Sequence, residues 1–172
     1  MRPDGYEIAK AAAAIHGITT EHAATNGVDL KAALAEVVAD AKHVVGKCGR
    51  ICAHNLEFDA TIVEEEMSRA KFDADAMANF FHAIRAGMCT MDPHLTKWCC
   101  EEHLRANALY GDGKDTLLHP VSLGNLTRVL PPEIQETCGP AHDAGADSRA
   151  TWLVLKELHR IVREDLASNE VQ

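Results

Sequence analysis

Apolar residues recur along the chain in two kinds of pattern. Three segments carry them at positions three and four apart, which predicts amphipathic helices: residues 29–45, 58–70 and 145–164. Two shorter apolar runs that end at turn residues predict strands: residues 50–53 and 88–91. Strands that alternate with helices are typical of an α/β fold.

Further elements follow from local signals between these segments. Asp29 and Asp73 each precede a helical pattern and are predicted to be N-caps, the second for a helix with a Phe stripe that ends at Gly87. A helix at 121–129 is predicted to be closed by Leu130-Pro131-Pro132. Residues 1–28 show no clear periodicity, so we expect a loop with a short helical piece at 9–14. Residues 94–120, with Trp98, are predicted to form a partly helical excursion.

Composition indicates one folded domain spanning 1–172, with a disordered tail at 166–172. The chain has 172 residues, of which 47% are hydrophobic, and this is enough for a core. A net charge of −9 argues against a protein that grips long duplexes through their phosphates. No signal peptide is found and no apolar run approaches the roughly 20 residues that span a bilayer, so we expect no membrane partner. A soluble intracellular protein, cytoplasmic or nuclear, is the expectation.

The six cysteines do not form a dense disulfide framework, and free buried thiols are the expectation. They are Cys48, Cys52, Cys89, Cys99, Cys100 and Cys138. Zinc sites around His54 or His103 are an alternative, but neither group of cysteines has paired C-x-x-C spacing.

The stretch Cys52-Ala53-His54-Asn55-Leu56-Glu57-Phe58-Asp59 joins a predicted strand to a predicted helix. In open α/β sheets, ligands bind at such junctions. Asp59 is a candidate metal ligand there, with the amide of Asn55 and the ring of Phe58 close to it in sequence as candidate contacts to a flat substrate.

Two stretches of the chain resemble motifs of the DEDDh (DnaQ-like) 3′→5′ exonucleases. His54-Asn55-x-x-Phe58-Asp59 resembles their second motif, and residues 141–151, in which His142 stands five residues before Asp147, resemble the third. Three further segments resemble parts of the same family in the same order: Ile15-His16-Gly17-Ile18-Thr19, Cys89-Thr90-Met91-Asp92 and Ser122-Leu123-Gly124-Asn125-Leu126. The family's first motif, Asp-x-Glu, is absent, and Asp4 and Glu7 are not assigned its role.

The resemblance implies a ribonuclease-H-like, three-layer α/β fold with a mixed sheet. The strand that carries Asp-x-Glu is central in that fold, so we expect the fold to be incomplete in this chain, with an open strand edge. The missing strands are expected upstream of Met1, or from a homodimer or a partner chain.

The resemblance also implies phosphodiester hydrolysis at the 3′ end of single-stranded DNA or RNA. Asp59 and Asp147 would bind two Mg²⁺ or Mn²⁺ ions, hard cations that prefer carboxylate oxygens. His142 would act as general base on the attacking water; a structural alternative is that it caps the following helix. His16, Asn55 and Phe58 would contact the terminal nucleotide.

Two functional classes stay open at this point. One is an active 3′→5′ exonuclease, and the other is a catalytically impaired domain of the same fold that serves as a nucleic-acid or protein binding module. Retention of Asp59, His142 and Asp147 together favours the enzyme. The sequence does not distinguish a DNA from an RNA substrate, or proofreading from trimming or degradation.

Overall fold

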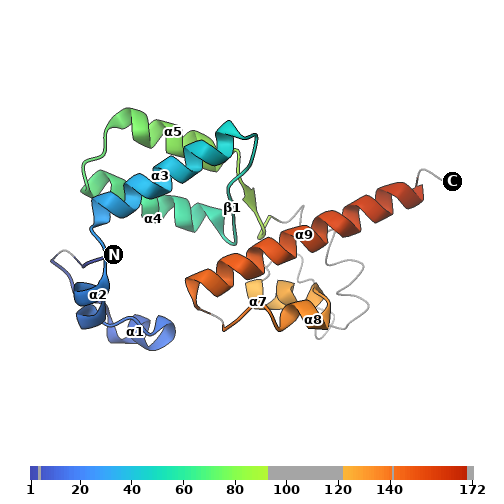
Figure 1. The fold of residues 1–172 in the computed structure, drawn as a ribbon, viewed down its shortest axis with the longest axis horizontal. Coiled ribbons are helices and arrows are strands. Elements are labelled where there is room, and N and C mark those ends of the chain that lie inside the picture. The colour runs from blue at the N-terminus through green and yellow to red at the C-terminus, as the bar shows by residue number, and fades with distance from the viewer. Residues whose placement is uncertain (4, 93–121, 141, 170–172) are drawn as a thin grey trace. The chain divides into compact units, whose positions relative to one another are not determined.

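A computed structural model of the chain describes residues 1–3, 5–92, 122–140 and 142–169 (Figure 1). The chain forms two compact units. Unit 1 comprises Met1–Ile51 and Leu56–Gly87, and unit 2 comprises Cys52–Asn55 and Met88–Gln172. The single domain expected from composition stays a prediction. The predicted excursion at 94–120, with Trp98, Cys99 and Cys100, lies outside the described residues.

Unit 1 is helical. Its helices are α1 (Lys10–His16), α2 (Thr20–Asn26), α3 (Leu30–Gly46), α4 (Leu56–Arg69) and α5 (Ala74–Arg85). Helices α3, α4 and α5 pack on one another (Figure 1). Their contacts bury Leu34 of α3, Met67 of α4 and Phe80 of α5, so each helix contributes its apolar face to the core.

The predicted helix starts in unit 1 are confirmed. The Asp29 carboxylate accepts a hydrogen bond from Ala32 N at 2.9 Å, and the Asp73 carboxylate accepts one from Ala76 N at 2.8 Å. Each bond satisfies one of the amides that a helix leaves without an internal partner at its N-terminus. The Phe stripe of α5 is also confirmed as core, because Phe80 is buried.

The short helical piece predicted at 9–14 is confirmed by α1, whereas the loop predicted for the rest of residues 1–28 is wrong where α2 forms. Alanine-rich sequence in α1 favours a helix without any apolar period, and Thr19 caps α2 by accepting from His22 N at 3.1 Å. His16 is therefore the last residue of α1 and not a loop residue. Its exposed ring accepts a hydrogen bond from Ile18 N at 3.1 Å.

Unit 2 contains a two-stranded parallel sheet and several helical segments. Strand β1 (Cys52–Ala53) pairs with β2 (Met88–Cys89), with Cys52 opposite Met88 and Ala53 opposite Cys89. The helical segments are α7 (Leu123–Leu126), the 3₁₀ turn η4 (Thr127–Val129), α8 (Pro132–Gln135) and α9 (Ala144–Asn169). Both predicted strands are confirmed, although each is two residues long.

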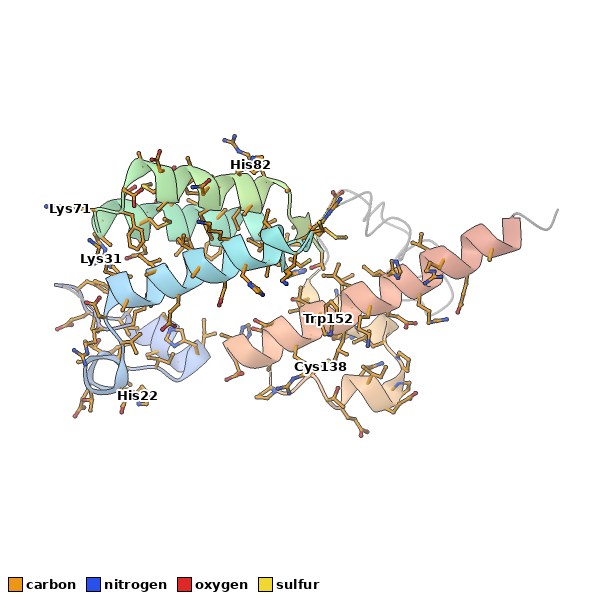
Figure 2. The ribbon with its side chains drawn as sticks, turned by 45° about the horizontal axis from the view of Figure 1, so that its top comes forward. His22, Lys31, Lys71, His82, Cys138 and Trp152 are labelled. Carbon is orange, nitrogen blue, oxygen red and sulfur yellow. The ribbon has the colours of Figure 1, made fainter. Side chains whose placement is uncertain are left out.

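Helix α9 covers an apolar cluster in unit 2. The buried members of this cluster are Leu126, Leu130, Cys138, Ala150, Val154 and Leu158. Trp152 lies on the same helix but is 61% exposed, since it faces away from the cluster (Figure 2). The helix ends at Asn169, so the predicted disordered tail is wrong for residues 166–169.

Among the cysteines that the structure describes, Cys48 and Cys138 are free thiols. Cys138 is buried, as expected, but Cys48 and Cys52 are exposed, so the prediction of buried thiols is wrong for these two. Cys48 lies in the turn after α3 with a positive φ of 58°, a conformation that is uncommon for residues other than glycine.

At the level of fold class, the chain combines many helices with a small parallel sheet, as an α/β prediction requires. Within the described ranges, no helix has the length and apolar character needed to cross a membrane.

Candidate functional site

The turn after β1 carries His54 and Asn55. Asn55 has a positive φ of 68°, which asparagine tolerates better than most residues because its short amide side chain fits a left-handed backbone. The turn passes directly into α4, which begins at Leu56. The predicted order of strand, tight turn and helix is therefore confirmed.

Phe58 and Asp59 lie in the first turn of α4, in unit 1. Phe58 is 60% exposed, so its ring is available to a ligand rather than packed in the core. Partial burial of the Asp59 carboxyl raises its pKa above the ordinary value, because desolvation disfavours the charged form.

Thr90, directly after β2, is the partner of His54. The Thr90 hydroxyl lies 2.9 Å from His54 Nδ1, and Thr90 is fully buried. Its backbone N–H donates to Ala53 O at 3.0 Å, which extends the contact between the two strands by one residue. From sequence, His54 was a candidate only for a zinc site, and Thr90 had no predicted site role. The available signal was the position of Thr90 immediately after an apolar strand.

The N-terminus of α9 holds the second group of candidate residues. Asp143 is the cap, since its carboxylate accepts from Ala146 N at 2.8 Å and its carbonyl accepts from Asp147 N at 2.8 Å. The alternative that His142 caps this helix is therefore wrong. His142 is exposed and has a positive φ of 66°, which places it in the loop ahead of the helix, as predicted.

Asp147 is half-buried on the first turns of α9 and acts on His54. Burial lowers the pKa of His54 below the ordinary value, and the negative charge of Asp147 opposes this effect only in part. His54 is therefore neutral near pH 7. Unit 2 brings together His54, Thr90 and Asp147, which belong to three separate segments of the chain.

The predicted site residues are divided between the units. His16, Phe58 and Asp59 belong to unit 1, whereas Asn55, His142 and Asp147 belong to unit 2. Their roles stay predictions.

The predicted metal ligands are two carboxylates, Asp59 and Asp147. Their oxygen atoms match the preference of Mg²⁺ and Mn²⁺ for hard ligands. Among the described residues, however, no group of three or more His, Cys, Asp or Glu side chains is arranged to hold a metal ion. The two carboxylates are thus suitable ligands for Mg²⁺ or Mn²⁺, but they do not form a complete metal site within the described residues.

Three comparisons with known proteins bear on identity. No family model matches the chain, and neither a curated protein nor a solved structure matches it.

Proposed function

We propose that this chain is a DEDDh-type 3′→5′ exonuclease domain that hydrolyses single-stranded DNA or RNA from its 3′ end. The observation that supports this function is the contact in unit 2 between α9, which carries Asp147, and β1, which leads into His54. These residues come from the two stretches that resemble the second and third motifs of the family. Motifs that act on one substrate have to lie close together, and this contact supports the proposal.

The proposed roles follow the chemistry of each side chain. Asp59 and Asp147 would bind two Mg²⁺ or Mn²⁺ ions, which stabilise negative charge on the phosphoryl oxygens when bound. Ligands beyond these two would come from outside the described residues. In the complete ribonuclease-H-like fold, further strands would join the β1–β2 sheet, supplied by a segment joined to this chain, by a second copy or by a partner chain.

His142 is the proposed general base. It is exposed ahead of α9, where its ring can reach a water molecule, and histidine is the side chain most often used as a general base. The exposed Phe58 ring would stack on the terminal base, Asn55 would bind its sugar, and His16 would contact the same nucleotide.

The test measures release of mononucleotides from a single strand labelled at its 5′ end, incubated with the protein and Mg²⁺ or Mn²⁺. We expect shortening from the 3′ end that stops in EDTA. Asp147→Asn should abolish it. Asp75→Asn is the matched control. Asp75, like Asp147, is a carboxylate in the first turn of a helix, but it is exposed and lies outside both motif stretches. Full activity in EDTA, or in Asp147→Asn, would exclude the proposed chemistry.

The second candidate is a catalytically impaired domain that binds single-stranded nucleic acid. It is favoured by the lack of a three-ligand metal group among the described residues. Binding of a fluorescent oligonucleotide, without release of mononucleotides at any Mg²⁺ or Mn²⁺ concentration, would support this candidate over the enzyme.

A further inference from the structure

Helix α9 carries a basic face that has no role in the function proposed above. Its residues recur at spacings of three and four, which places them on one side of the helix: Arg149, Trp152, Lys156, His159 and Arg163. All of them are exposed, and no Asp or Glu occupies a position of this pattern. The chain as a whole has a net charge of −9, so this face departs locally from the overall composition.

The charged groups of the basic face are able to bind a ligand. Within the described residues, the side chains of Lys156 and Arg163 take part in no hydrogen bond or ion pair. The Arg149 guanidinium donates from Nη1 to Thr137 O at 3.3 Å, which leaves most of its N–H donors for another partner.

The glutamates that flank the basic face are engaged by a different cation. Arg160 lies at the edge of this face, 2.6 Å from a carboxylate oxygen of Glu157 and 2.6 Å from one of Glu164. These carboxylates therefore offset the charge of Arg160 rather than that of Lys156 or Arg163. The basic face keeps a positive charge of its own.

Trp152 lies within the basic face and is 61% exposed (Figure 2). An exposed indole ring offers a large flat apolar surface, on which a nucleic-acid base can stack. Cations that contact phosphates, together with an aromatic ring that stacks on a base, form the arrangement that binds single-stranded nucleic acid. The composition of the basic face fits this ligand in both respects.

Other anionic partners fit the basic face less well. A helix that lies on an anionic membrane has to insert an apolar face, and the apolar face of α9 is buried through Val154 and Leu158 in the cluster of unit 2. An acidic protein segment would satisfy the cations but has no base to stack on Trp152. A single strand supplies phosphates and flat bases together.

We propose that the basic face of α9 binds single-stranded nucleic acid, with Arg149, Lys156 and Arg163 contacting phosphates and Trp152 stacking on a base. From Arg149 to Arg163 the helix rises by about 21 Å, a length that several nucleotides can follow. The inference deepens the proposed nuclease function by naming a surface for the strand, and it rests on that function only where activity is measured.

The basic face is separate from the candidate catalytic carboxylate on the same helix. Asp147 stands seven residues before Val154 and eleven before Leu158, both buried, so it lies on the side of α9 opposite to the basic face. The basic face would therefore hold the strand away from the reacting end.

Fluorescence anisotropy tests the binding, with the 172-residue chain and a labelled single strand of about 16 nucleotides. EDTA is present so that no metal-dependent hydrolysis occurs. Affinity should fall as salt rises, because cations that contact phosphates displace counterions. The double variant Lys156→Gln/Arg163→Gln removes two such contacts. We expect it to reduce the slope of log affinity against log salt by about 0.7 for each contact, about 1.4 in total.

The matched control removes two exposed cations from unit 1, in the double variant Lys42→Gln/Arg85→Gln. It makes the same change in net charge on helices α3 and α5, and it should leave the salt slope as in the wild type. An unchanged slope in the α9 double variant would overturn the inference. Binding of anionic phospholipid vesicles in preference to the strand would also overturn it, in favour of a membrane surface.

Two substitutions of Trp152 test the stacking. Trp152→Leu keeps an apolar side chain and removes the ring, whereas Trp152→Phe keeps a ring. Loss of one stacked base should weaken binding by about 5-fold to 150-fold in Trp152→Leu, and Trp152→Phe should retain most of the affinity. An abasic strand of equal length should bind the wild type more weakly than the strand with bases. Equal binding of the two strands would refute the stacking even if Trp152→Leu did not fold.

Activity with Mg²⁺ or Mn²⁺ distinguishes this inference from the proposed function. We expect the α9 double variant to raise KM with little change in kcat, because it weakens binding of the strand away from the reacting end. If the wild type binds the strand through the basic face but releases no mononucleotides, the proposed function fails and the inference stands. If the wild type is active and the α9 variants bind as it does, the inference fails and the proposed function stands.

Discussion

Replacement of Asp143 tests whether the cap of α9 positions the candidate residues on either side of it. The Asp143 carboxylate bonds Ala146 N at 2.8 Å, and it stands between His142 and Asp147. Asp143→Ala removes the acceptor and the negative charge at the helix N-terminus. Loss of an N-cap costs about 1 kcal/mol, and loss of the charge interaction with the helix dipole about 0.3–1 kcal/mol.

The expected total is therefore about 1–2 kcal/mol, a factor of roughly 5 to 30 in an opening equilibrium. Amide hydrogen exchange measures this locally, at Ala146, Asp147 and the following residues of α9. Asp143→Asn keeps an oxygen acceptor and should lose only the charge term. We expect its exchange rates to lie between those of the wild type and Asp143→Ala.

Unit 1 supplies the matched control. Asp29 caps α3 with almost the same geometry, 2.9 Å from its oxygen to Ala32 N, but it lies far from both motif stretches in sequence. Asp29→Ala should accelerate exchange at the start of α3 to a similar extent and leave the proposed nuclease rate unchanged, whereas Asp143→Ala should lower that rate. Unchanged exchange at Ala146 in Asp143→Ala would refute the cap assignment, and equal loss of activity in both variants would refute its positioning role.

Three further predictions concern the core, the pH dependence of stability and the general base. Met67 is fully buried in unit 1, so Met67→Ala should lower the free energy of unfolding by about 2–5 kcal/mol in denaturant titration, and a loss below 1 kcal/mol would contradict this packing. The pKa of Asp59 is raised in the folded state, so just above the ordinary pKa of 3.8 the folded chain binds more protons than the unfolded chain. As the pH rises through this window, ionisation of Asp59 lowers the free energy of unfolding. Asp59→Asn should therefore raise Tm relative to the wild type at pH 7 and lose this advantage at pH 3, and a variant with the opposite trend would show that the desolvation is absent. His142→Ala should reduce kcat of the proposed nuclease with little change in oligonucleotide affinity, and an undisturbed pH–rate profile would place the base elsewhere.

Local sequence determined several helices and their starts. Asp29 and Asp73 each bond an amide three residues ahead, so the signal and the structure that it produces lie within one helical turn. Part of α1 was also predicted, at residues 9–14, where alanine propensity favours a helix without an apolar period. The start of α8 was overlooked: Pro132 begins this helix, because the first position of a helix tolerates a residue without an N–H.

The motif stretches were recognisable from sequence, but the environment of their side chains was not. Cys52 belongs to an apolar run and is nevertheless exposed, and Phe58 sits in an amphipathic pattern with most of its ring exposed. Exposure depends on which distant segments pack against a position, and residue spacing carries no information about them.

Tertiary structure alone decided the environment of His54. The parallel pairing of β1 with β2 brings the Thr90 hydroxyl within 2.9 Å of His54 Nδ1, and the packing of α9 brings the charge of Asp147 to the ring. These three residues are far apart in the chain, so no local pattern relates them. Their hydrogen bond and charge interaction exist because two strands and a helix meet in unit 2, and a contact between distant segments is determined by the fold as a whole.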